Sequence, residues 1–189
     1  MSFLKKAAVV AAVAGITLTL AGCQSQQVEH EMAAPAPVLN NQDLYEVGHE
    51  GRHYVFDDFA VYQEFLSVGE TSYRKVFIGE GPQGKSLVFG LRSEDKKKLE
   101  GLAGVSMYKG QMPAADDFYG EMRGEDGRLY VFSRLEDMQA VRNTGEAAFR
   151  LTQIGNGPQG QTVVFVLNDS NKKVFPTELV ARFKQMNNL

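Results

Sequence analysis

The chain has 189 residues, of which 43% are hydrophobic and 23% charged, and its formal net charge is −3 at pH 7. This composition is typical of a globular protein that can bury a core, and it excludes a disordered or collagen-like chain. The single cysteine excludes an internal disulfide and any zinc site built from several cysteines. The longest basic run is the three lysines 96–98, so we expect no nucleic-acid partner.

The first 22 residues predict a signal peptide. Lys5 and Lys6 precede an uncharged, mostly apolar run of fifteen residues, Ala7 to Ala21. A membrane-spanning helix needs about 20 apolar residues, so this run fits the core of a signal peptide better than a permanent anchor. The run leads into Leu20-Ala21-Gly22-Cys23, which contains the only cysteine of the chain.

These four residues resemble the lipobox of bacterial lipoprotein signals. The resemblance implies that the chain is cut before Cys23, that the thiol of Cys23 carries acyl chains, and that these chains hold the protein at a membrane. In Gram-negative lipoproteins an aspartate directly after the cysteine usually marks inner-membrane retention. Gln24 stands there instead, which implies an outer-membrane protein facing the periplasm. An ordinary secretory signal with an incidental cysteine is the alternative.

Residues 23–41 predict a flexible tether. The segment is mostly polar and contains Ala-Pro-Ala-Pro at 34–37. Such a composition disfavours packed structure, so we expect the folded part to begin at residue 42 and to stay close to the membrane.

The next segment predicts a β-hairpin, with Tyr45, Val47 and the run 53–56 on either side of a glycine-rich turn at 48–51. The turn contains His49-Glu50-Gly51-Arg52-His53, which matches the zinc-protease string H-E-x-x-H. That string requires a helix, on which both histidines share one face, and the flanking glycines disfavour a helix here. We therefore expect no metal site, with zinc or copper binding at His49 and His53 as the alternative.

A helix and a second hairpin are expected to follow. Asp57 is the predicted N-cap of the helix and Gly69 its C-terminal glycine. Two strands, at 73–78 and 86–91, are joined by Gly79-Glu80-Gly81-Pro82-Gln83-Gly84. This loop matches G-x-G-x-x-G, but a nucleotide site needs a helix after the loop, and a strand is predicted there. Whether residues 99–108 form a helix is left open, because the two glycines in this segment disfavour one.

The second part of the chain repeats the first at an offset of 76 residues. Residues 51–97 and 127–173 share 20 identities in 47 positions without a gap, including Gly-Pro-Gln-Gly at 81–84 and 157–160. The second copy predicts a helix with a capping box at Ser133 and Glu136, ended by Gly145, and strands at 149–154 and 162–167. A C-terminal helix is expected from about Thr177 to Met186.

We therefore predict an α+β fold with an antiparallel sheet and two tandem pseudo-repeats, residues 42–112 and 113–189. Each would be a β-hairpin, a helix and a second β-hairpin, and the C-terminal helix would follow.

The glycine loops are the main candidate for function. Turn geometry explains their glycines and prolines, and we prefer that interpretation. No backbone angle requires Gln83 and Gln159, which makes these two residues candidates for contacting a partner. Catalytic motifs such as G-x-S-x-G are absent. We expect a non-catalytic binding or structural module of the cell envelope, with a protein or glycan partner and no cofactor. The alternative handles a metal or small ligand through the hairpin histidines or the cleft between repeats.

Overall fold

The computed structural model describes residues 39–189. The predicted signal peptide, Cys23 and the tether up to residue 38 lie outside the described residues. Leu39 packs against the core, and the side-chain amide of Asn40 donates to the main-chain oxygen of Asp57 at 2.6 Å. The chain thus contacts the folded part three residues before the expected start at 42.

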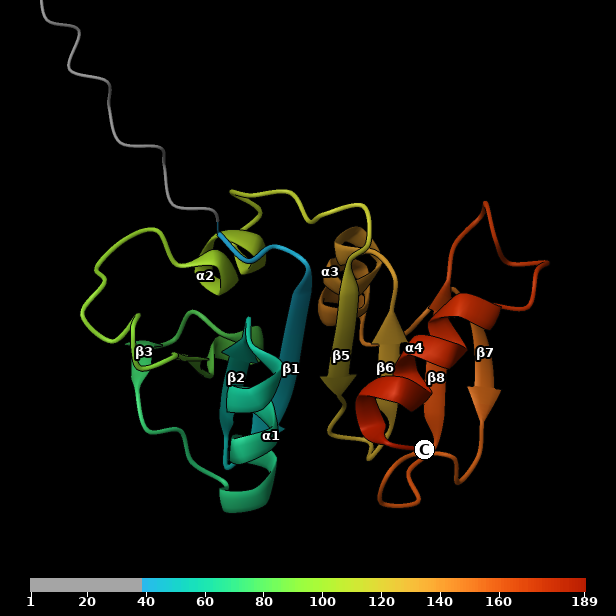
Figure 1. The fold of residues 1–189 in the computed structure, drawn as a ribbon, viewed down its shortest axis with the longest axis horizontal. Coiled ribbons are helices and arrows are strands. Elements are labelled where there is room, and N and C mark those ends of the chain that lie inside the picture. Colours follow the sequence, from blue (N-terminus) through green and yellow to red (C-terminus); the bar gives the residue numbers. More distant parts are fainter. Residues whose placement is uncertain (1–38) are drawn as a thin grey trace, which may run out of the picture. The chain divides into compact units, whose positions relative to one another are not determined.

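Eight strands and four α-helices make up the described part, in an α+β arrangement (Figure 1). In chain order they are β1 (Asp43–His49), β2 (Arg52–Phe56), α1 (Phe59–Val68), β3 (Arg74–Phe77), β4 (Ser86–Gly90), α2 (Ala103–Tyr108), β5 (Tyr119–Arg123), β6 (Leu129–Phe132), α3 (Leu135–Thr144), β7 (Phe149–Gln153), β8 (Val163–Leu167) and α4 (Thr177–Asn187).

All eight strands form one sheet in the order β3-β4-β2-β1-β5-β6-β8-β7. Neighbours β1–β2, β3–β4, β5–β6 and β7–β8 are antiparallel, while β1–β5, β2–β4 and β6–β8 are parallel. The sheet is therefore mixed, which corrects the predicted antiparallel sheet. The pairs β2–β4 and β6–β8 are parallel because α1 and α3 each carry the chain across the sheet before the next two strands form, as a parallel pairing requires. The third parallel pair, β1–β5, joins the first half of the sheet to the second.

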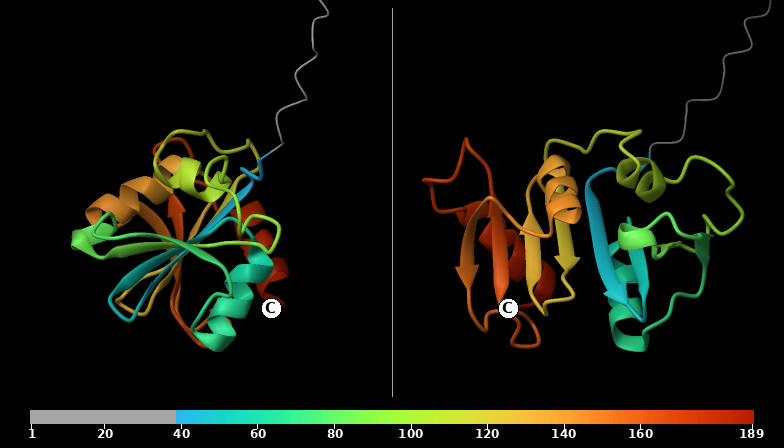
Figure 2. Two further views of the ribbon diagram at one scale, coloured as in Figure 1. Left: turned by 90° about the vertical axis from the view of Figure 1, so that its left-hand side faces the viewer. Right: turned by 180° about the vertical axis from the view of Figure 1, so that it is seen from behind.

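Helices cover both faces of the sheet, and each face has its own core. α2 and α3 pack on one face over a cluster that includes Leu87, Met107 and Met138. α1 and α4 pack on the other face over a cluster that includes Tyr62, Phe165 and Phe183. Figure 2 shows the two helix pairs on opposite sides of the strands. None of the helices within residues 39–189 has the length and apolar character needed to cross a bilayer.

The observed C-terminal caps of α1 and α3 are the predicted ones, whereas the observed N-terminal caps differ from the prediction. Gly69 and Gly145 end α1 and α3 at φ 82° and 79°, in the left-handed region that favours glycine. The side chain that caps α1 belongs to Asp58, not Asp57, and accepts from the Val61 amide at 3.0 Å. The N-cap of α3 is Arg134, without a side-chain cap, so the capping box predicted at Ser133 does not form.

Asp57 has another structural role, at the start of α2. Its carboxylate accepts a hydrogen bond from the main-chain nitrogen of Gly104 at 2.8 Å. A Cβ at position 104 would lie 3.3 Å from the Cβ of Asp57, so glycine suits this close approach. The helix left open for residues 99–108 thus forms as α2, because a contact over 47 residues supports its first turn.

Candidate functional site

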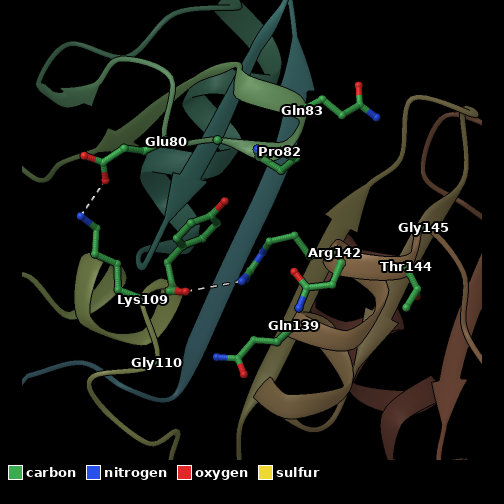
Figure 3. Close-up of a pocket in the computed structure, with 12 residues that line it drawn as sticks. Glu80, Pro82, Gln83, Lys109, Gly110, Gln139, Arg142, Thr144 and Gly145 are labelled. Atoms are coloured by element: carbon green, nitrogen blue, oxygen red, sulfur yellow. Dashed lines mark hydrogen bonds and ion pairs between the residues drawn. The ribbon is translucent and has the colours of Figure 1, made fainter.

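A groove on the α2 and α3 face has a volume of about 700 Å³. Figure 3 shows three segments around the groove: the first glycine loop with Pro82 and Gln83, the end of α2 with Lys109, and the C-terminal half of α3. Tyr108, the last residue of α2, also lines the groove. α3 contributes Gln139, Arg142, Asn143, Thr144 and, after its end, Gly145. Residues of both predicted repeats therefore line the same groove.

A smaller cavity of about 270 Å³ adjoins the groove. The two share four lining residues, namely Pro82, Gln83, Arg142 and Gly145. Met122, Tyr130 and Val141 contribute apolar surface and His53 a polar group, so this cavity is more apolar than the main groove.

A buried ion network lies beneath both cavities. The side chain of Glu46, on β1, is fully buried and meets Arg142, on α3, across 96 residues of sequence. Nε of Arg142 donates to Glu46 Oε2 at 2.9 Å, and Nη2 donates to Oε1. On the other side, His53 Nε2 lies 2.8 Å from Glu46 Oε2. The paired donors of arginine suit a carboxylate, so Arg142 is held in one orientation.

The pKa values of this network follow from the balance of burial and charge. Burial alone would raise the pKa of Glu46, but Arg142 and His53 outweigh burial and lower this pKa to about 2. Burial disfavours the charged form of Arg142, whereas the Glu46 carboxylate raises the pKa of Arg142. Burial, and then the charge of Glu46, raises the pKa of Tyr108 to about 12. Glu46 is thus ionised and the Tyr108 hydroxyl neutral at physiological pH.

The charged side chains on the walls are also paired. Lys109 Nζ donates to Glu80 at 2.8 Å, as the dashed line in Figure 3 shows, and both residues line the groove. Lys85 Nζ donates to Glu125 beside the smaller cavity. The second pair joins the two predicted repeats at the surface.

Gln83 lines both cavities in a strained backbone conformation. It lies within the short 3-10 turn Pro82–Gly84, with φ 57° and ψ 27°. Non-glycine residues rarely adopt this left-handed conformation, and strain of this kind clusters at functional sites. No hydrogen bond joins the Gln83 side chain to any other residue within 39–189, so its amide is available to a ligand.

Gln159, which aligns with Gln83 at the 76-residue offset, lines a different cavity, and its side chain is hydrogen-bonded. It contributes to a cavity of about 290 Å³ between α1, α4 and the second glycine loop, on the other face of the sheet. Its side-chain oxygen accepts from Gln161 Nε2 at 3.0 Å, and its main-chain nitrogen donates to Gln161 Oε1 at 2.9 Å. Gln161 aligns with Lys85 of the first loop. Lys85 makes no such contact with Gln83 and pairs with Glu125.

The two hairpin histidines point to opposite faces of the sheet. Glu50 and Gly51, at φ 48° and 73°, form a two-residue turn of the kind that joins twisted strands. The His49 ring packs edge-on against Phe65 of α1 at 5.6 Å, while His53 contacts Glu46 under the groove. Side chains of a strand alternate between faces, so the two rings diverge. Within residues 39–189 no group of three or more potential metal ligands lies close together.

The structure brings together Gln83 and His53, and separates both from Gln159 and His49. The sequence analysis did not identify Arg142, Gln139, Asn143 or Tyr108, and it did not predict that Glu46 is buried. The burial of Glu46 could have been predicted, because it alternates with Leu44 and Gly48 along β1 and so shares the face of the buried Leu44. A buried carboxylate requires a cationic partner, but nothing local indicates which residue supplies it.

Comparisons of the chain with protein-family models, with curated proteins and with solved structures give no match.

Proposed function

We propose that the protein is an envelope lipoprotein whose folded part is a non-catalytic binding module. Acyl chains on Cys23 anchor it in the outer membrane, and the folded part faces the periplasm. The groove between the first glycine loop, α2 and α3 is its binding site. The partner is a protein or a glycan of the cell envelope.

The observation that carries this proposal is the difference between the two glycine loops. Gln83 faces the groove in a left-handed conformation and has no side-chain partner within residues 39–189, whereas Gln159 is tied to Gln161. If the shared Gly-Pro-Gln-Gly sequence served only the turn, nothing would require the strain at Gln83. A ligand that bonds to its amide supplies a reason.

A non-catalytic role agrees with the state of the ionisable groups. Glu46 and His53 are the carboxylate and imidazole that acid–base catalysis at this site would use. Both are buried and bonded to each other, and Glu46 is also bonded to Arg142. Glu46 lines neither cavity, and His53, which lines the smaller one, already has its Nε2 bonded to Glu46.

We also propose that residues 42–112 and 113–189 are duplicated units related by a pseudo-twofold axis along the central strands. The strand order supports this, since it pairs β3-β4-β2-β1 with β7-β8-β6-β5 when counted from the two edges. Such an axis exchanges the faces of the sheet, which agrees with α1 and α3 on opposite faces.

An alternative is a small ligand in the cavity of about 270 Å³, which residues of both segments line around Met122, Tyr130 and Val141. Its mostly apolar walls favour this candidate. A small ligand would fill the cavity without extending along the glycine loop.

In-cell photocrosslinking tests the binding role. A benzophenone amino acid replaces Gln83 in one strain and Gln159 in a matched control strain. We expect a discrete crosslinked envelope partner from position 83 and none from 159. Equal products from both positions, or none from 83, would contradict the groove as the binding site.

The anchoring part has a separate test. In cells fed an alkyne fatty acid, the wild-type chain should be labelled and sediment with membranes. Cys23→Ser should lose the label and leave the membrane fraction. Persistent labelling of this variant would refute lipidation at Cys23.

A further inference from the structure

We infer that the groove binds an extended, uncharged stretch of polypeptide, with one apolar side chain seated in the smaller cavity. The inference rests on the proposed function, which makes the groove the binding site, and it decides between protein and glycan as the occupant.

The polar lining of the groove suits a peptide backbone. Gln83 lies on the wall formed by the first glycine loop, and Gln139 lies on the wall formed by α3. Asn143, also on α3, is a further lining residue of the groove. A side-chain amide both donates and accepts hydrogen bonds, as a peptide group does. Gln139 donates to the Met107 oxygen at 3.3 Å, which orients its amide. Gln83 and Asn143 make no side-chain hydrogen bond to residues 39–189, so both amides can bond to a chain lying between the walls.

The charges of the groove favour an uncharged segment. Each cation that lines the main groove already has an anionic partner: Lys109 is paired with Glu80, and Arg142 with Glu46. In the smaller cavity Lys85 is paired with Glu125, and Arg123 donates to the Tyr62 hydroxyl at 3.0 Å. A charged ligand group in the main groove would have to break one of its two ion pairs or remain without a partner in a partly enclosed site. Either event opposes binding, so the site selects against charge.

The aromatic residues of the groove disfavour a glycan. A sugar ring is held by its C–H groups against an open aromatic face, where the π-cloud is negative. The Arg142 guanidinium lies 4.0 Å from the centre of the Tyr108 ring, and the ring meets Phe89 edge-on at 5.7 Å. Tyr130, in the smaller cavity, is only 4% exposed. Neither ring offers an open face to a sugar.

The smaller cavity supplies the anchoring position. Met122, Tyr130 and Val141 are each at most 8% exposed and form an apolar floor. A volume of about 270 Å³ is on the scale of one large side chain rather than a whole ligand. Because this cavity opens into the groove at Gln83, a backbone lying in the groove can direct a leucine, methionine or phenylalanine into it.

Selection from a random peptide library tests the inference. The acylated full chain, purified in detergent, is panned against phage-displayed peptides. The binding constant of a synthetic consensus peptide is then measured by fluorescence polarisation. We expect a consensus with one large apolar residue and no charge beside it. Replacing that residue with serine should weaken binding at least tenfold.

Matched protein variants locate the bound peptide. Gln83→Ala removes one amide, and Asn143→Trp places a bulky side chain in the groove from an exposed position of α3. Each should weaken binding at least tenfold. The residues at the same offset on the other face give the controls, Gln159→Ala and Ser67→Trp, which should bind the peptide as the wild type does.

The outcomes separate this inference from the proposed function. Binding that survives both groove variants, or that does not need the apolar residue, overturns the inference. If N-acetylglucosamine tetramer binds instead and Asn143→Trp abolishes that binding, the peptide class is wrong and the proposed binding role stands. Failure of both probes, together with no crosslink from position 83, overturns both.

Discussion

At the scale of single residues, the two glutamines of the glycine loops differ in the free energy of their backbone conformation. A left-handed conformation costs an ordinary L-residue about 1–2 kcal/mol relative to a right-handed one, because Cβ crowds the following carbonyl oxygen. Gln83 is in this conformation, and Gln159 is not among the non-glycine residues with positive φ in the described chain. The same substitution should therefore have opposite effects at the two positions.

We expect Gln83→Gly to raise the free energy of unfolding by about 0.5–1 kcal/mol, because glycine removes the left-handed strain. Gln159→Gly should lower it by about 0.5–1 kcal/mol, because glycine there only increases the freedom of the unfolded chain. Urea unfolding of both variants checks this. Changes of the same sign would contradict the assigned backbone conformations.

The buried network at Glu46 should dominate the stability of the groove. Glu46→Gln leaves Arg142 charged and buried without its partner, which should lower the free energy of unfolding by about 3–5 kcal/mol at pH 7. Glu125→Gln breaks the more exposed pair with Lys85 and should cost about 1 kcal/mol or less. A similar loss from both variants in urea unfolding would contradict this ranking.

The same carboxylate should give the protein an acid-dependent stability. The pKa of Glu46 is lowered in the fold to about 2 from an ordinary value of 4.5. A lowered pKa stabilises the fold above the unfolded value, and the contribution is lost as pH falls from about 4.5 to about 2. The stability difference between wild type and Glu46→Gln should therefore shrink across that range. A difference that stays constant down to pH 2 would contradict the lowered pKa.

The sequence predicted some residue roles of the site and could not predict others. Glycines with positive φ, such as Gly69 and Gly145, were predictable because few other residues end a helix in that way. Arg142 was not, because its partner is 96 residues away and its own helix position shows only that it is polar. Local patterns contain no information about which helix covers which strand.

At the scale of secondary-structure elements, local patterns located the strands and the hairpin partners β1–β2 and β3–β4, and left the contacts between hairpins undetermined. β3 was expected at 73–78 and spans Arg74–Phe77, and α4 was expected to end near Met186 and ends at Asn187. The parallel contact of β1 with β5 joins strands about 76 residues apart. Alternation within a strand indicates which of its side chains are buried, but it does not indicate which other strands lie beside it.

The turns of both glycine loops should depend on their glycines. Gly84 and Gly160 have φ of 75° and 78°, and a Cβ added at either position would meet no atom within 4 Å, so the cost of substitution is conformational. Gly84→Val and Gly160→Val should each lower the free energy of unfolding by about 1 kcal/mol or more. Lys97→Ala, at an exposed loop position, should change it by less than about 0.5 kcal/mol. Thermal unfolding compares the three variants.

At the scale of the whole molecule, both faces of the sheet carry a buried glutamate that contacts a helix from the other segment. Glu46 of β1 binds Arg142 of α3, and Glu121 of β5 accepts from Tyr62 of α1 at 3.0 Å. Both contacts lie next to the central β1–β5 pair. They hold residues 42–112 and 113–189 together from opposite sides, so we expect the described part to unfold as one cooperative unit.

Metal ions should leave this unit unchanged. His49 and His53 face opposite sides of the sheet, so they cannot share one ion in the folded state. Zinc or copper at tenfold excess should therefore not alter the melting temperature of the wild type. A metal-dependent rise that disappears in the His49→Ala, His53→Ala double variant would contradict this expectation, since only binding to the folded state raises the melting temperature.

The position of β1 also determines how the fold responds to mechanical force. The first strand of the described chain is hydrogen-bonded on both sides, to β2 and to β5, in the middle of an eight-stranded sheet. Tension between the N-terminus and an opposing load along the strand direction would shear both ladders at once. Under the proposed lipid anchor and binding groove, a load on the groove would therefore be resisted by two strand pairings and not by one edge.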